Sequence, residues 1–461
     1  MAGHSWELMP SVIIVEILSY LALKDRLHAS LVCRRWRSYL FQAKLWPKLS
    51  VCLRRNRRQK NKFLADVCGR FVRECAIYFD PHDGEELKDC YKILQILCDN
   101  KNLQVLQLQP RSCHIEWTET VTSGRFAQRL ECIIRTSRKL RHVSLGCSEE
   151  ILAHSGYFLD RLSSLHGNSL EALHLASVKE DSDNYGIVDL DVYKFRTFTS
   201  LKHLSIDYDF LDNQLLHIFS EPSRQPLETL NIHVHGVGPE HENVTNASWR
   251  QFSNHNKRIE VTINLIHSYT GVSKLLDILK QNLPLTHFRQ FFCSNINVPA
   301  LGLMANSYCN TLKSVHIVDG FEQGVPAVYE VTTDEDPFVM MAWKCLNLSH
   351  FTLIGYEMSD HDVVAIARLR GEGLQELHIP ASCVHWVDED NIEVVGNIDP
   401  EFAEMISSSL RRTWKPLEDD QLPDAVFDDW ADAEVAYNDI LLKDQQYRKP
   451  VNGTSGTVTS S

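Results

Sequence analysis

A short pattern of apolar and polar positions recurs along most of the chain. The pattern is L-x-x-L-x-L, with leucine, isoleucine, valine or phenylalanine at the apolar places. Because side chains alternate between two faces along a strand, the x-L-x-L part predicts a short strand whose apolar side chains point into a core. Eight copies occur, at residues 103–108, 140–145, 170–175, 201–206, 227–232, 312–317, 348–353 and 374–379.

The spacing of these copies predicts a repeat architecture. Successive first positions lie 37, 30, 31, 26, 85, 36 and 26 residues apart. The one large gap is close to three repeat lengths of about 28 residues, a period typical of solenoid proteins. We therefore expect two degraded copies in the gap, at residues 258–263 and 285–291, and a weak copy at residues 72–77 that opens the array.

Stretches between the copies have apolar residues at three- and four-residue intervals, which predicts helices. The clearest are residues 89–99, 125–136, 156–166 and 272–282. Strands alternating with helices predict an α/β fold: an irregular leucine-rich-repeat solenoid with parallel strands on the concave side and helices outside. An unrelated α/β sheet is the alternative.

The first predicted helix, residues 10–21, is apolar on nearly every side. Pro10 suits a first helical turn, where its missing N–H has no cost. Ile13 and Ile17 form one stripe and Ile14 and Leu18 form the next, so only a narrow polar strip remains. A unit of about forty residues rarely has enough core to bury such a helix alone. We expect a partner protein to cover its second face.

The first fifty residues resemble an F-box. The landmarks are Trp6 to Pro10, the apolar helix, Asp25-Arg26-Leu27, Leu31 to Trp36, and Leu45-Trp46; Met9 replaces the usual leucine, a tolerated change in volume. The resemblance implies a three-helix domain that binds a Skp-type adaptor and, through it, cullin and RING subunits. An ordinary helical hairpin is the alternative. The expected adaptor-binding residues are Trp6, Met9, Pro10, Ile13, Ile14, Ile17, Leu18, Leu21, Leu31, Val32, Cys33, Trp36 and Trp46.

Changes in composition suggest the domain boundaries. Six basic residues occur within residues 54–62, which indicates a solvated linker or a nuclear-import signal. Beyond residue 381 the chain becomes acidic, as expected for a polar cap on a solenoid. The predicted order is an F-box at 1–52, a basic linker at 53–64, the solenoid at 65–383, an acidic capping segment at 384–450 and a disordered tail at 451–461.

Total composition excludes several classes of function. A formal charge of −13 argues against nucleic-acid binding, because phosphate backbones attract basic surfaces. Thirteen cysteines, with no leader before them, indicate reduced thiols. No apolar stretch is long enough for a membrane span. We expect a cytoplasmic protein, with the nucleus as the alternative that the basic run leaves open.

Histidine is unusually frequent at the outward positions of the predicted strands, which suggests a substrate-binding surface on the concave face. Solvated surface histidines are the plain alternative. A metal site is not expected, since these histidines are spread over many repeats; the pair His233 and His235 is only weak evidence for zinc. The candidate residues are His142, His174, His203, His233, His316, His350 and His378.

No catalytic or cofactor-binding motif is present in the sequence, so we expect no catalytic residue and no cofactor. The predicted function is the non-catalytic substrate-recognition subunit of a ubiquitin ligase built from a Skp adaptor, a cullin, a RING subunit and an F-box protein. The alternative is a leucine-rich-repeat scaffold or inhibitor that binds the adaptor without degrading its partner.

Overall fold

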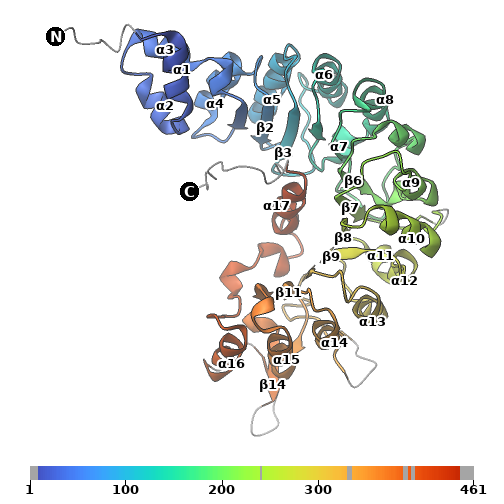
Figure 1. The fold of residues 1–461 in the computed structure, drawn as a ribbon. Coiled ribbons are helices and arrows are strands. Elements are labelled where there is room, and N and C mark those ends of the chain that lie inside the picture. Colours follow the sequence, from blue (N-terminus) through green and yellow to red (C-terminus); the bar gives the residue numbers. More distant parts are fainter. Residues whose placement is uncertain (1–8, 239–240, 330–334, 388–392, 396–399, 447–461) are drawn as a thin grey trace.

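The computed structural model describes residues 9–238, 241–329, 335–387, 393–395 and 400–446. Helices α1 to α3 stand at one end of a curved array in which strands line the inner side of the arc and helices the outer side (Figure 1). The predicted fold class, a helical F-box followed by an irregular leucine-rich-repeat-like solenoid, is confirmed. The tail at 451–461 and Trp6 lie outside the described residues.

The N-terminal domain is a small bundle held by one half-buried arginine, Arg26. It consists of α1 (Ser11–Ser19), α2 (Leu23–Ala29), α3 (Arg34–Leu40) and the 3-10 turn η2 (Ala43–Leu45). The Arg26 guanidinium donates to the carbonyl oxygens of Leu18 and Leu21 at 3.0 Å each, and also to that of Leu45. These oxygens lie in the last turn of a helix or just after it, where carbonyls lack intrahelical donors. Arg26 therefore ties the three segments together.

Twelve described strands form one sheet in which every neighbouring pair is parallel and follows sequence order. All eight predicted copies, both degraded copies and the opening copy form strands. The strands are β1 (Lys48–Cys52), β2 (Glu74–Phe79), β3 (Val105–Pro110), β4 (His142–Ser144), β5 (Ala172–His174), β6 (His203–Asp207), β7 (Thr229–Val234), β8 (Glu260–Ile266), β9 (Leu285–Phe291), β10 (Ser314–Val318), β11 (His350–Ile354) and β13 (Glu376–His378).

Strand β1 was not predicted. It lies within the segment 1–52 assigned to the F-box, and it carries only the alternating pair Leu49 and Val51, without the leucine that opens the repeat pattern. Because β1 pairs with β2 along five residues, the N-terminal domain and the array share a continuous edge. Phe41 of the N-terminal domain also packs edge-on against Phe63 of the next helix, with ring centroids 5.8 Å apart.

Helices cover the convex side, apart from the last helix of the chain, which returns to the inner side (Figure 1). The predicted helix at 272–282 is instead two short helices, and residues 58–64 of the predicted linker belong to α4. The helices are α4 (Arg58–Cys68), α5 (Gly84–Leu97), α6 (Ser123–Thr136), α7 (Glu149–Leu152), α8 (Ser155–His166), α9 (Asn213–Ile218), α10 (Asn246–His255), α11 (Tyr269–Ser273), α12 (Leu275–Ile278), α13 (Val298–Ser307), α14 (Pro337–Lys344), α15 (Asp360–Arg370), α16 (Pro400–Leu410) and α17 (Glu434–Asp444). A second small sheet contains β12 (Met358–Ser359), β14 (Val384–Val387) and β15 (Glu393–Val395). No helix among the described residues has the length and apolar character needed to cross a bilayer.

The acidic C-terminal segment does two different things. Helix α16 packs on α15 at the end of the array, as a cap would. Helix α17 instead returns to the inner side of the arc and lies between its two arms (Figure 1). Its Asn438 amide donates to the carbonyl of Pro110 at 3.2 Å, and its Tyr437 ring lies 5.4 Å from that of Phe291, between ring centroids. The concave face is therefore partly covered by the chain's own C-terminal helix.

Candidate functional site

The N-terminal helices expose a set of large apolar side chains. Ile13 is 47% exposed, Leu31 67%, Val32 73%, Val12 75% and Tyr20 80%. Val12, Ile13 and Tyr20 lie on α1 or directly after it, and Leu31 and Val32 follow α2. A large exposed apolar patch is rare on a monomeric protein and usually marks an interaction site. These five residues are called the N-terminal apolar patch below.

The structure divides the predicted adaptor-binding residues into two groups. Ile14 and Leu18 are fully buried and Trp46 is 3% exposed, so the prediction that these three face a partner is wrong. Ile14 and Leu18 lie on the side of α1 that packs inside the bundle. Trp46 lies two residues before β1 and also packs inside. Ile13, Leu31 and Val32 are exposed, as is Pro10, whereas Met9, Ile17, Leu21, Cys33 and Trp36 are half-buried.

Val12 and Tyr20 were missed as surface candidates. The signal was present, because α1 is apolar on almost all sides and only one of its stripes can face its own bundle. The F-box landmarks do not separate surface residues from core residues, and several of them, such as Ile14 and Leu18, lie in the core. Burial in the structure separates these two roles.

The candidate histidines all lie on the sheet, but the expectation that they are solvated is wrong for three of them. His142 and His174 are 1% exposed and His233 is 2% exposed. Neighbouring strands and the C-terminal helix cover this part of the concave face, a contact that sequence spacing does not reveal. The other candidates, His203, His316, His350 and His378, are half-buried.

Two of these histidines form a hydrogen bond with the residue beside them on the next strand. His174 Nδ1 lies 2.7 Å from the Ser205 hydroxyl, and His203 Nδ1 lies 3.0 Å from that of Thr229. In both cases the strand register pairs the two residues. A neutral imidazole can both donate and accept, so it can satisfy a hydroxyl within a buried row. Part of the histidine enrichment therefore has a structural explanation.

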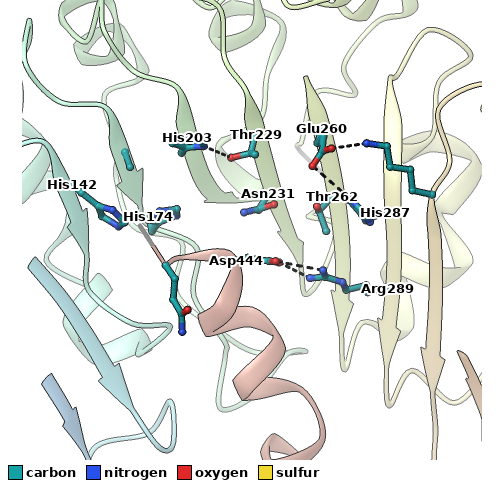
Figure 2. Close-up of a pocket in the computed structure, with 13 residues that line it drawn as sticks. His142, His174, His203, Thr229, Asn231, Glu260, Thr262, His287, Arg289 and Asp444 are labelled. Carbon is teal, nitrogen blue, oxygen red and sulfur yellow. Dashed lines mark hydrogen bonds and ion pairs between the residues drawn. The ribbon is translucent and has the colours of Figure 1, made fainter. Parts of the chain in front are cut away.

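A polar cavity of ≈ 210 Å³ opens on this face between β4 and β10 (Figure 2). Glu260 Oε1 lies 2.5 Å from Lys313 Nζ, and its Oε2 lies 3.9 Å from His287 Nε2. The nearby His287 imidazole, and then the hydrogen bond from Lys313, lower the pKa of Glu260 to about 2. On the same strand as His287, Arg289 forms an ion pair with Asp444 of α17 (Figure 2).

Most of the charged residues of this cavity were not among the residues predicted from the sequence. Glu260, His287 and Arg289 come from the two degraded repeats, which lack the full leucine pattern. Asp444 comes from α17, whose return to the array leaves no local signal. Lys313 directly precedes β10, so the outward positions of that repeat could have indicated it.

The structure also brings together three residues that the sequence did not group. Asp207 joins His233 and His235, because the register of β6 and β7 pairs Asp207 with His233. One potential ligand atom from each lies within 4.8 Å of the other two. The sequence-based expectation that no compact ligand set exists is therefore wrong for these residues.

Replacing His142 should reduce the loss of stability in mild acid. Burial lowers the pKa of His142 to about 3, from a usual value near 6.5. Between these values the unfolded chain binds a proton that the folded chain does not, so the free energy of unfolding falls as the pH drops below about 6.5. From pH 7.5 to pH 5.5 this contribution is about 1.4 kcal/mol. Urea unfolding at both pH values should show His142→Gln losing less stability than wild type by about that amount. If the variant and wild type lose equal stability between the two pH values, the lowered pKa of buried His142 is contradicted.

Comparison with known proteins covers nearly the whole chain. The F-box-like family matches residues 6–52. F-box only protein 33 of Homo sapiens is 27% identical over 472 residues, which cover 89% of this chain and 83% of the relative. F-box/LRR-repeat protein 21 of Ovis aries is 21% identical and covers 90% of both chains.

Among the solved structures that match is a TLR13–ssRNA13 complex, with a TM-score of 0.32 at 10% identity, over 74% of this chain and 50% of the solved chain. The F-box resemblance inferred from the N-terminal residues is confirmed by the family match. Residues 6–52 are an F-box domain, and the chain as a whole is homologous to F-box only protein 33 and to F-box/LRR-repeat proteins.

Proposed function

We propose that this protein is the substrate-recognition subunit of a ubiquitin ligase of the Skp adaptor, cullin, RING and F-box type. The observation that carries the proposal is the N-terminal apolar patch on an F-box domain. Its five large side chains are between 47% and 80% exposed, although the bundle already has its own core in Ile14 and Leu18. A Skp-type adaptor would supply the missing cover for this patch.

The chain's own contribution to the reaction would be proximity rather than chemistry. An F-box at one end of a rigid arc holds whatever the arc binds at a set distance from the ligase, which raises the effective concentration of the substrate lysine. The continuous pairing of β1 with β2 supports this role, because it makes the joint between the F-box and the array stiff. Ubiquitin transfer itself would belong to other subunits.

We place the substrate surface at the cavity on the concave face. It combines an acceptor, Glu260, with the donors Lys313 and Arg289, and with half-buried His203. Such a lining suits a polar or charged segment of a partner protein better than an apolar one. His316, His350 and His378 extend the same row of strands toward the far end of the array.

The ligase proposal is tested best with point variants. Deleting the first fifty residues would remove three of the five residues of β1 and damage the array edge. The variant Leu31→Asp with Val32→Asp should instead leave the array intact, and it should trap partners that wild type passes on for ubiquitination. Partners captured by both proteins are then tested in a reconstituted reaction. Ubiquitination with wild type alone supports the ligase; partners that stay unmodified with both would favour the scaffold alternative.

Substitution within the cavity should weaken partner capture. Lys313→Ala with His287→Ala removes two side chains that line the cavity, and both lie next to Glu260. We expect capture of substrate to fall by ~10-fold or more, because losing a close charge pair at an interface can cost about 1.4 kcal/mol or more. Lys101→Ala, exposed and away from the cavity, is the matched control. Capture equal to that of the control would place the substrate surface elsewhere.

A further inference from the structure

Four atoms that could bind a metal ion converge at the ends of β6 and β7. Asp207, His233 and His235 are 3%, 2% and 2% exposed. The carbonyl oxygen of Ser177 lies 2.7 Å from His233 Nδ1 and 3.0 Å from His235 Nε2. His235 Nε2 in turn lies 3.9 Å from Asp207 Oδ1. Two imidazoles, one carboxylate and one backbone carbonyl thus surround a single point.

These separations fit a tetrahedral ion of the first transition series. Zinc binds nitrogen and oxygen ligands at about 2.0–2.1 Å, so neighbouring ligand atoms of a tetrahedral site lie about 3.3 Å apart. The separations found here, 2.7, 3.0 and 3.9 Å, lie on both sides of that value. Small side-chain shifts would therefore seat an ion between the four atoms.

The charge balance around the cluster also favours a cation. Lys179 Nζ lies 3.6 Å from both Asp207 Oδ2 and Glu149 Oε1. Asp209 lies close by and accepts from the Tyr185 hydroxyl at 3.2 Å. The carboxylates of Asp207 and Glu149 therefore share one ammonium, and Asp207 is almost completely buried. Such a surplus is unfavourable unless a positive charge offsets it.

We infer that Asp207, His233 and His235, with the Ser177 carbonyl, form a structural zinc site that links three successive repeats. All four positions around the ion are occupied by protein atoms and are buried, which is typical of structural rather than catalytic zinc. Neutral imidazole is the form that binds the ion. Binding moves the proton of each ring to its other nitrogen, without net proton release. The Nδ1 atom of His235 is buried and has no hydrogen-bond partner among the described residues, so it can carry the proton that leaves Nε2.

The test begins with the full-length wild-type chain and Zn²⁺ alone. The chain is stripped with chelator, incubated with Zn²⁺, passed through gel filtration and assayed for metal by mass spectrometry. We expect about one zinc per chain, and a four-coordinate Co²⁺ visible spectrum when cobalt replaces it. A folded wild-type chain that retains no zinc would overturn the inference and leave these residues as a hydrogen-bond network.

The variant His233→Gln with His235→Gln separates the two explanations. A glutamine amide can still donate to the Ser177 carbonyl, so the network survives, whereas zinc retention should fall by at least ~10-fold. His241→Gln is the control, because this histidine bonds to the Tyr208 carbonyl at 2.9 Å, outside the cluster. Equal zinc retention in the double variant would also overturn the site. If the double variant does not fold, X-ray absorption of zinc-loaded wild type decides: two imidazole ligands support the site, and fewer refute it.

Discussion

The variant Leu31→Asp with Val32→Asp should bind a Skp-type adaptor at least ~100-fold more weakly than wild type. These side chains are 67% and 73% exposed, and they lie directly after α2 in the N-terminal apolar patch. Burying a leucine or valine contributes about 1.5–3 kcal/mol, and burying an unpaired carboxylate in the same place is unfavourable. The sum exceeds the ~2.7 kcal/mol that a 100-fold change requires. Titration calorimetry with purified adaptor measures it directly.

Val435→Asp is the control for this variant. Val435 is 67% exposed, like Leu31, but lies on α17, far along the chain from the F-box. Adaptor affinity should be unchanged in the control, and the thermal unfolding of both variants should match wild type, because neither site is in the core. If the double variant binds the adaptor as tightly as wild type does, the N-terminal apolar patch is not the adaptor surface.

Replacing Tyr437 and Leu441 by alanine should release α17 from the concave face. Tyr437 is 2% exposed; its ring contacts that of Phe291, and its hydroxyl lies 3.2 Å from His267 Nε2. Leu441 is fully buried. Large-to-small changes at such positions cost about 2–5 kcal/mol each, which is more than the polar contacts of one three-turn helix are expected to offset. Hydrogen exchange in residues 434–446 should become at least ~100-fold faster, since each 1.4 kcal/mol is a factor of ten.

The same experiment reports on the face beneath the helix. Gln445, just after α17, accepts from the Ser144 hydroxyl at 2.7 Å, and its amide donates to Cys147 Sγ at 3.1 Å. Amides around these residues should therefore lose protection together with α17, while those of the convex helices keep theirs. Val435→Ala, an exposed position on the same helix, should change neither. Unaltered exchange in the double variant would mean that the polar contacts alone hold α17.

Local periodicity was sufficient for the predicted strands and for the F-box. A repeat builds its core from its own leucines and those of its neighbours, so apolar spacing along the chain and contacts in space coincide. The degraded copies at β8 and β9 could be located because stacking leaves no room for a missing unit. Strand β1 was missed since it has only half the pattern. The exposed part of α1 could be anticipated as a surplus of apolar positions, but not residue by residue.

Tertiary structure alone decided which histidines are buried and which residues share a site. Ser144 and Gln445 meet although 301 residues separate them, and Arg289 meets Asp444 across 155. No periodic signal encodes such contacts, because a returning helix is specified by shape and polarity rather than by spacing. The cluster of Asp207, His233 and His235 is an intermediate case, because the strand positions were predicted but their register was not. Once the register of β6 and β7 is known, it places Asp207 beside His233.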